Sequence, residues 1–162
     1  MRLAIRQAGH EDVATIKRLL REALVSAEGV EEHVGSFLLI EEAEAGVIGT
    51  VGMEVLEGRY GLLRSLVVKR GMTSAQIGAE MIALFIAYVE TTDVEELYLL
   101  TQSTTAPLFI HIGFSTIDKE QLPQAVAQCQ HFLAYSQQEA VAMVKKIAST
   151  SYPHSAVDSV NK

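Results

Sequence analysis

The chain has 162 residues, of which 49% are hydrophobic and 20% are charged. This length suits one domain, and this composition is that of a globular protein rather than a disordered one. The formal net charge of −7 at pH 7 argues against nucleic acid and anionic membranes as partners, because both require clustered Lys and Arg. We therefore expect a small-molecule or protein partner.

Cysteine content and hydrophobic runs predict a soluble, cytoplasmic protein. Cys129 is the only cysteine, so neither an intramolecular disulfide nor a Cys-based metal site is expected. The first residues, MRLAIRQAGHEDV, lack the apolar core of a signal peptide. The most apolar run, residues 77–89, contains Glu80 and is shorter than the roughly 20 residues that span a bilayer.

The first half of the sequence alternates between strand and helix patterns. Residues 3–8 predict a strand, and the spacing of apolar residues predicts a helix over residues 11–27. A helical turn is expected within residues 30–36. Three apolar, β-branched segments then follow with short turns between them, which predicts an antiparallel meander over residues 37–43, 47–56 and 60–68.

In the second half, the apolar period changes from 2 to 3.6 at Thr73 or Ser74, either of which would cap a helix. A strand is expected at residues 96–101, and then a short helix that Gly113 ends. The remaining predicted elements are a strand at 114–118, a helix from Pro123 to Ser136 and a strand at 139–147. Residues 1–147 are thus predicted to form a single domain, followed by a mobile tail over 148–162.

This order of elements predicts an α/β protein with a central mixed, mostly antiparallel sheet of six to seven strands, flanked by helices. The strand LLRSLVV, the helix after it, the strand LYLLT and the helix ending in LFIHIGF resemble the successive core motifs of the GNAT superfamily of N-acetyltransferases. The resemblance covers residues 2–147. YGLLRSLVV, LYLLTQSTTAPLFIHIGF and EAVAMVKKI look most similar to small-amino-acid acetyltransferases of the N-acetylglutamate synthase, arsenic-resistance and phosphinothricin types.

The resemblance implies acetyl-CoA as cosubstrate. In the family, the strand that matches residues 62–68 diverges from the strand that matches 96–101, and the pantetheine arm lies between them. The implied backbone contacts come from Leu66, Val67 and Val68. The pyrophosphate then lies on the amino end of the next helix, where free N–H groups and the helix dipole favour an anion.

The loop before that helix departs from the family pattern. An Arg or Gln, two residues, Gly, one residue and a final Gly or Ala fall on Thr73, Ser74, Ala75, Gln76, Ile77 and Gly78, with Ala79 following. Only Gly78 matches. Gln76 places a side chain where a glycine would let phosphate approach, and Thr73 supplies no cation. Lys69 and Arg70 either compensate electrostatically or belong to a solvated loop, and the Thr73 and Ser74 hydroxyls either bind phosphate or only cap the helix.

The family often takes a proton for the leaving thiolate from a tyrosine. Here the matching residue is Phe109, so water, Ser103 or Thr104, or no group at all, must serve. Phe109 and Thr104 are otherwise expected beside the cofactor, and Thr101 beside the thioester and substrate.

Two charged residues interrupt the apolar strands. Glu54 is either a general base acting through water or an exposed carboxylate at a strand end. Arg64 shares a face with Leu62 and Leu66 by the period of 2, and it needs an anionic partner. That partner is either Glu54, in a structural ion pair, or the carboxylate of an amino-acid substrate.

The function expected from the resemblance is transfer of acetyl from acetyl-CoA to the amine of a small polar or amino-acid-like acceptor, directly within a ternary complex. The expected partner is this small molecule, with no nucleic acid, membrane or metal, and with a homodimer through the late strand and helix left open. The alternative is a catalytically silent GNAT-fold binding or oligomerisation module. Its support is the three departures at Thr73, Gln76 and Phe109.

Overall fold

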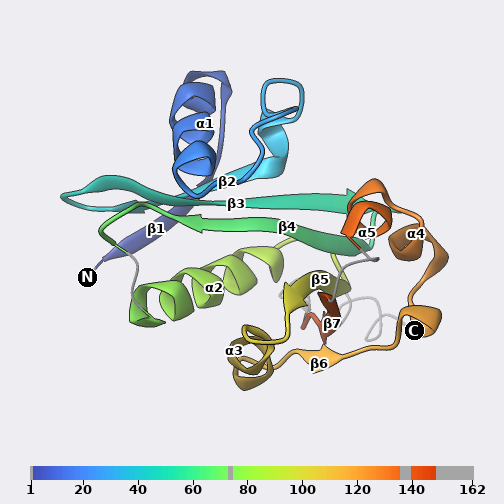
Figure 1. The fold of residues 1–162 in the computed structure, drawn as a ribbon. Helices are drawn as coiled ribbons and strands as arrows, with labels where there is room; N and C mark the ends of the chain where they lie inside the picture. The colour runs from blue at the N-terminus through green and yellow to red at the C-terminus, as the bar shows by residue number, and fades with distance from the viewer. Residues whose placement is uncertain (1, 73–74, 136–139, 149–162) are drawn as a thin grey trace, which may run out of the picture. The chain divides into compact units, whose positions relative to one another are not determined.

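The computed structural model describes residues 2–72, 75–135 and 140–148 (Figure 1). Its strands form one seven-stranded sheet in the order β1-β2-β3-β4-β5-β7-β6. The strands are β1 Leu3–Gln7, β2 Phe37–Glu42, β3 Gly46–Leu56, β4 Tyr60–Val68, β5 Glu96–Gln102, β6 Ser115–Thr116 and β7 Ala140–Lys146. The helices are α1 Val13–Glu22, α2 Ala75–Val89, α3 Ala106–His111, α4 Gln124–Ala127 and α5 Gln130–Tyr135, with 3-10 turns at His10–Asp12, Val34–Ser36 and Lys119–Gln121. The mixed sheet with flanking helices confirms the predicted fold class.

The chain divides into two compact units. Unit 1 contains Met1–Glu54 and Leu63–Phe85, and unit 2 contains Val55–Leu62 and Ile86–Lys162. A single domain over residues 1–147 stays a prediction. Most of the predicted tail, residues 149–162, lies outside the described residues.

In unit 1, β1 pairs with β2 and β2 with β3, both antiparallel, as expected for β2 and β3. Helix α1 lies on one face of these strands, and the part of α2 up to Phe85 lies on the other (Figure 1). The α1 side is a hydrophobic cluster, because the apolar face of α1 packs against strand residues of the same side. Its buried members are Ala8, Ile16, Leu19, Leu20, Val30, Val34, Leu39 and Val67.

The opposite face of unit 1 contains a close approach between β3, β4 and α2. A Cβ placed on Gly49 would lie 2.3 Å from the Met81 Cε and 2.7 Å from the Val67 carbonyl oxygen. Only a glycine fits there, because the Val67 contact is with backbone and cannot move independently. Gly49 therefore holds α2 and β4 against β3.

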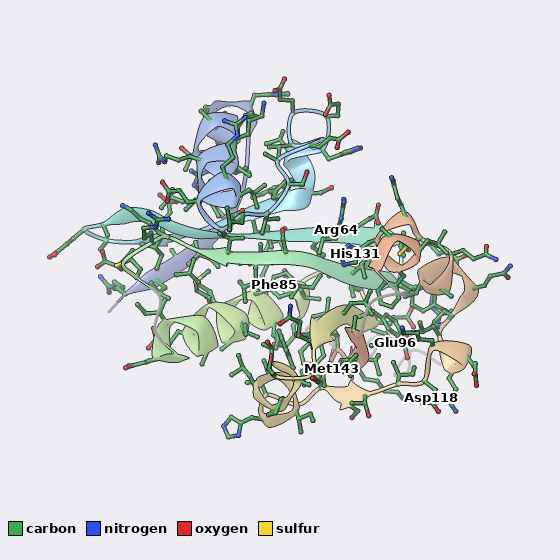
Figure 2. The ribbon with its side chains drawn as sticks, viewed as in Figure 1. Arg64, Phe85, Glu96, Asp118, His131 and Met143 are labelled. Atoms are coloured by element: carbon green, nitrogen blue, oxygen red, sulfur yellow. The ribbon has the colours of Figure 1, made fainter. Side chains whose placement is uncertain are left out.

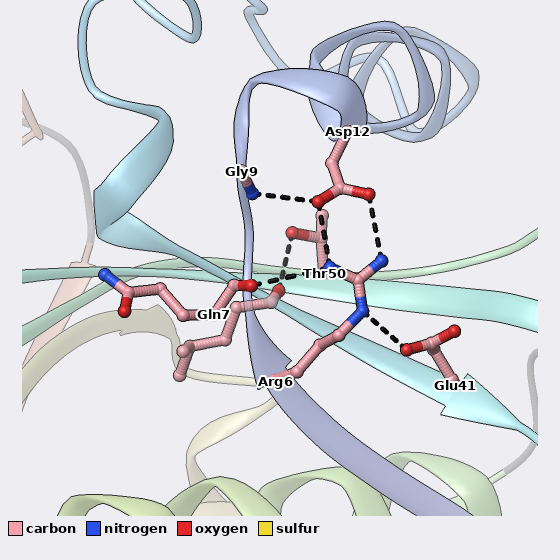
Figure 3. A network of polar contacts seen from close by, with 7 residues as sticks. Arg6, Gln7, Gly9, Asp12, Glu41 and Thr50 are labelled. Atoms are coloured by element: carbon pink, nitrogen blue, oxygen red, sulfur yellow. Dashed lines mark hydrogen bonds and ion pairs between the residues drawn. The ribbon is translucent and has the colours of Figure 1, made fainter.

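A polar network ties the start of α1 to the sheet (Figure 3). Arg6 donates from Nη1 and Nη2 to the two carboxylate oxygens of Asp12, at 2.9 Å each, and from Nε to Glu41 at 2.6 Å. The Gly9 N–H also donates to Asp12. The bonds from Arg6 and then from Gly9 hold the pKa of the buried Asp12 carboxyl below its ordinary value. This network is structural, and each of its charges has a partner.

The prediction of a helix over residues 11–27 is wrong at its carboxyl end. The α-helix ends at Glu22, because Leu24 adopts the left-handed conformation with φ of 60°. The Leu24 N–H donates to the Arg21 carbonyl and the Val25 N–H donates to the Leu20 carbonyl, which is the hydrogen-bond pattern of a Schellman motif. No glycine marks this end, so the sequence did not indicate it.

In unit 2, the first residues of β4 pair with β5 in parallel, from Tyr60 opposite Glu96 to Leu62 opposite Tyr98. Strand β5 pairs with β7 along Glu96–Gln102, and β6 pairs with β7. The turn before β4 has positive φ at Glu57 and Gly58, as in a type I′ hairpin turn. A buried cluster of Leu62, Tyr98, Val126, Phe132 and Ala142 forms the core of this unit.

Two predicted elements of unit 2 differ in the structure. The expected helix from Pro123 to Ser136 is instead two short helices, α4 and α5, with Gln128 and Cys129 between them. Strand β6 covers only Ser115–Thr116. The predicted stop at Gly113 is confirmed, since it has φ of 105° and the Phe114 N–H donates back to the Phe109 carbonyl.

Across the ranges that the structure describes, none of the helices combines the length and the apolar character needed to cross a bilayer.

Candidate cofactor and acceptor site

The last residues of β4, Leu66, Val67 and Val68, have one backbone edge against β3 and one that faces away from β3. The Lys69 N–H donates to the Ile48 carbonyl at 2.6 Å, and the Val67 carbonyl oxygen lies beside Gly49. Because backbone groups alternate along a strand, those of Leu66 and Val68 point away from β3. Of the three predicted backbone contacts, these two are therefore on the edge away from β3, and Val67 is on the β3 side.

Two successive residues of β4, Arg64 and Ser65, both lie close to Gly52 of β3. A Cβ on Gly52 would be 3.0 Å from the Ser65 Oγ and 3.7 Å from the Arg64 Cβ, so both neighbours lie on the same side of β3. Two successive residues facing one residue of the partner strand define a β-bulge. The same position is 3.5 Å from the Phe37 ring, which belongs to the α1 side. The strict alternation expected for Arg64 is therefore wrong.

Arg64 is an exposed cation with no partner in the part of the chain that the structure describes. Its side chain projects to the α1 side of unit 1 (Figure 2), and among the described residues it makes no hydrogen bond or ion pair. Glu54, on the same side of β3 as Gly52 by alternation, is half-buried and also has no partner among the described residues. The structural ion pair between them, one of the two expected alternatives, is not formed.

The predicted phosphate-binding loop is described from the first residue of α2 onward. Thr73 and Ser74, and with them the predicted hydroxyl contacts and cap, lie outside the described residues. Helix α2 begins at Ala75, and its first N–H groups have no partner within the helix by geometry. Exposed on the loop before it are Lys69 and Arg70.

The side chain of Gln76 follows the helix surface. Its Nε2 donates to the Glu80 Oε1 at 3.5 Å, one helical turn along. A Cβ on Gly78 would have no atom of the described residues within 4 Å, so these residues leave the space beside it open. Ile77 and Ala79 are half-buried in the same turn. The first turn of α2 thus retains an open side despite the glutamine.

The remaining predicted residues lie in unit 2. Thr101 pairs with Val141 in the β5–β7 ladder, and Ser103 and Thr104 are exposed in the turn after β5. Phe109 is only 6% exposed and packs edge-to-face against Phe114, with ring centres 5.6 Å apart. Packing in the core accounts for Phe109 without a ligand.

Sequence reasoning missed Gly49, Gly52 and Ser65. The signal was present, since two glycines inside the apolar strand VIGTVGMEVL indicate close backbone approach or a bulge in the neighbouring strand. Nothing comparable marks a metal site: in the described part of the chain, no three His, Cys, Asp or Glu side chains are placed to hold a metal ion.

Comparisons with known proteins identify the fold. The sequence matches no known family profile. It is 28% identical over 143 residues to the uncharacterized protein YwlB of Bacillus subtilis, covering 88% of this chain and 95% of that protein.

Two solved structures of other proteins superpose well. N-acetylglutamate synthase from Neisseria gonorrhoeae, complexed with coenzyme A and N-acetyl-glutamate, matches with a TM-score of 0.75 and 21% identity over 91% of this chain. This chain spans only 35% of that enzyme. Rv2747 from Mycobacterium tuberculosis, in complex with CoA, matches with a TM-score of 0.71 and 19% identity, covering 88% of this chain and 98% of that one. The chain therefore has the GNAT acetyltransferase fold, as the sequence motifs predicted.

Proposed function

We propose that this protein is an acetyl-CoA-dependent N-acetyltransferase acting on the amine of a small polar or amino-acid-like acceptor. The observation that carries the proposal is that unit 1 contains both an edge of β4 that faces away from β3 and, at the start of α2, space beside Gly78 that the described residues leave open. It is supported by the fold and by the coenzyme A bound to N-acetylglutamate synthase and to Rv2747.

The residues of unit 1 fit the chemistry of coenzyme A. The backbone groups of Leu66 and Val68 offer hydrogen bonds to an amide-containing arm. The amino end of α2, at the positive end of the helix dipole, favours a diphosphate, and the described residues leave space beside Gly78 for it to approach. Lys69 and Arg70, which precede α2 by a few residues in the sequence, add positive charge. Contacts from Thr73, Ser74, Thr104 and Phe109 remain predictions.

Acetyl-CoA supplies a thioester whose carbonyl carbon bonds to the acceptor nitrogen while the C–S bond breaks. Glu54, half-buried and without a cationic partner among the described residues, takes the proton that the acceptor amine loses, through a water molecule. Arg64 orients the acceptor. Direct transfer in a ternary complex, proton donation by Ser103 and a contact from Thr101 are further parts of the proposal.

A catalytically silent module is the second candidate. One observation favours it: the residue at the position of the usual tyrosine, Phe109, is buried against Phe114 and has no proton to donate. A thiolate leaves readily without full protonation, so this loss slows acetyl transfer more than it prevents it. We therefore rank this candidate second.

The test is a free-thiol release assay with acetyl-CoA over a panel of amino acids and amines, with the acetylated product identified by mass. Thermal shift with CoA measures binding separately, because a ligand of the native state raises its apparent stability. We expect product and a shift. A shift without product on any amine supports the silent module. If neither product nor a shift is observed at millimolar CoA, the proposal is overturned.

The loop is tested with Gln76→Glu. This change places two carboxylates one helical turn apart and adds negative charge beside the diphosphate position, so we expect CoA affinity to fall about 10-fold. Gln121→Glu is the matched control, since it makes the same change at an exposed residue outside the site. Equal CoA affinity in the two variants would remove α2 from the cofactor site.

A further inference from the structure

Strand β1 leaves one backbone edge of unit 1 without a neighbouring strand among the described residues. It lies at the end of the sheet and pairs only with β2. The Ala8 N–H donates to the Phe37 carbonyl at 2.9 Å, and backbone groups alternate along a strand, so every second residue before Ala8 also faces β2. The residues between them turn their backbone N–H and C=O groups away from the sheet, and these are Leu3, Ile5 and Gln7.

This edge lacks the features that usually protect an edge strand from pairing, which are a free charge, a proline or a bulge. The register with β2 is unbroken over Leu3–Gln7, a segment without proline. Its one charged side chain, Arg6, is held by Asp12 and Glu41 (Figure 3). The Arg6 Nη1 also donates to the Gln7 carbonyl at 3.4 Å, a long contact that leaves this oxygen a second lone pair. The edge can therefore accept another strand.

We propose that β1 pairs with β1 of a second copy of this chain, antiparallel and centred on Ile5. The inference goes beyond the proposed function and does not depend on acetyl transfer. The Ile5 N–H of each copy donates to the Ile5 carbonyl of the other, and Leu3 of each copy pairs with Gln7 of the other. The two Ile5 side chains, half-buried in the single chain, then lie directly opposite each other and pack together.

Charge favours this register over its two neighbours. A pair centred on Ala4 would place Arg2 opposite Arg6 of the second copy, and a pair centred on Arg6 would place two arginines opposite each other. Like charges directly opposite destabilise a strand pair. The register centred on Ile5 instead places Arg6 opposite the small side chain of Ala4. It is also the register in which all three outward-facing residues of β1 pair with one another.

Opposite charges at the two ends of β1 make the edge complementary to itself. Arg2 precedes the strand and Glu11 follows it, and both are exposed and make no ion pair with the described residues. The Glu11 Oε2 lies 2.8 Å from the position of a Cβ on Gly9, beside the end of the strand. In the proposed register Arg2 lies opposite Ala8 of the second copy, next to this carboxylate. The two-fold axis repeats the contact, so the complement of this edge is the chain itself.

The first experiment measures sedimentation equilibrium of the untagged protein. We expect a monomer–dimer equilibrium with a micromolar dissociation constant, because one strand pair is a small interface. Arg2→Glu and Glu11→Arg should each raise this constant about 10-fold, since either change places like charges together at both ends of the pair. Arg18→Glu and Glu22→Arg, at exposed sites of α1, are the matched controls and should leave it unchanged. A protein that stays monomeric at millimolar concentration overturns the inference.

Mixing the two charge variants tests the pairing itself. In a mixed dimer the introduced glutamate faces the introduced arginine at one end, and the native Arg2 faces the native Glu11 at the other. The mixed dimer should therefore be within about 3-fold of the wild-type dissociation constant, while each variant alone stays weak. A mixture that associates no more tightly than the separate variants overturns the inference.

Hydrogen exchange of single amides identifies the strand. The Ile5 N–H points outward, so its exchange should slow about 10-fold when the protein concentration rises through the dissociation constant. The Arg6 N–H belongs to the ladder with β2 and should stay protected at every concentration. A dimer in which Ile5 exchange does not depend on concentration uses another surface and overturns the inference.

Ile5→Pro removes the outward donor without removing a bond between β1 and β2. We expect this variant to be monomeric and to keep the protection of the Arg6 amide. An Ile5→Pro dimer as tight as the wild type overturns the inference. If the variant fails to fold, the mixing experiment decides, because both of its substitutions are at exposed positions.

Discussion

Arg6 and Arg64 both interrupt strands of unit 1, but only one of them is tied to the protein. Arg6 binds Asp12 through both terminal nitrogens and Glu41 through Nε. Arg64 is exposed on a bulge and has no partner among the described residues. The first arginine joins the edge strand to the start of α1, while the second is the one that we propose orients the acceptor. A strand cation is therefore assigned to structure or to function by its partners.

The largest effect is expected from breaking the structural arginine. Arg6→Met leaves the buried Asp12 carboxylate without its main partner and should lower the free energy of unfolding by about 3 kcal/mol. Arg64→Met should change it by less than about 0.5 kcal/mol, because Arg64 makes no ion pair or hydrogen bond with the described residues. Denaturant unfolding of both variants checks the contrast. Comparable losses would mean that Arg64 is structural as well.

Gly49→Ala tests the packing that holds β4. The added methyl would meet Met81 and the Val67 carbonyl oxygen, so we expect a loss of about 2 kcal/mol of stability from overpacking. CoA affinity should also fall, since the displaced strand carries Leu66 and Val68. Gly46→Ala is not an equivalent control, because Gly46 has a positive φ. Gly78→Ala is the comparison, because it adds a methyl where the described residues leave open space. Gly78→Ala should change the free energy of unfolding by no more than about 0.5 kcal/mol while it reduces CoA binding.

The Arg6 network also predicts a pH dependence. Because the folded-state pKa of Asp12 is lowered, its contribution to stability is present above the ordinary carboxyl value of 3.8 and is lost as the pH falls through the lower folded value. Asp12→Asn should therefore be less stable at neutral pH and lose less stability on acidification below about pH 4. Unfolding curves between neutral pH and pH 2 measure this, and parallel curves would contradict it.

The smallest change is expected at the end of α1. Leu24 is 95% exposed and has φ of 60°, a conformation that costs a residue with a side chain about 1 kcal/mol relative to glycine. Leu24→Gly should therefore stabilise the protein by nearly that amount, with no effect on CoA binding. Thermal unfolding checks the sign. Destabilisation would indicate that the exposed leucine makes a contact in solution.

Local patterns were enough for most of the elements. The β-branched run between Gly58 and Gly71 predicted β4 with the bounds that the structure has, and Gly113 correctly predicted the end of α3. The end of α1 was missed because the left-handed residue is a leucine, which carries no turn signal. The later helix was predicted as one continuous segment, although Gln128 and Cys129 separate α4 from α5.

The candidate site was predicted less well. Glu54 and Arg64 were identified as the charged residues of apolar strands. The sequence did not decide whether Arg64 pairs with Glu54 or binds the carboxylate of a substrate. A period of 2 also assumed a regular β4, whereas Arg64 and Ser65 both lie near Gly52 of β3, and a bulge depends on the neighbouring strand rather than on the residues around it. The proximity of Gly52 and Ser65 became visible only once the strands were in place.

By itself, the sequence determined the order of the elements, the class of the fold and its resemblance to acetyltransferases, because hydrophobic period and turn residues act over a few neighbours. Only the tertiary structure decided which charges are neutralised and which remain free. Arg6 and Glu41 are 35 positions apart in the chain, and no local pattern reports such a contact. For the same reason, the sequence could not show that Arg64 has no partner within the described ranges of the chain.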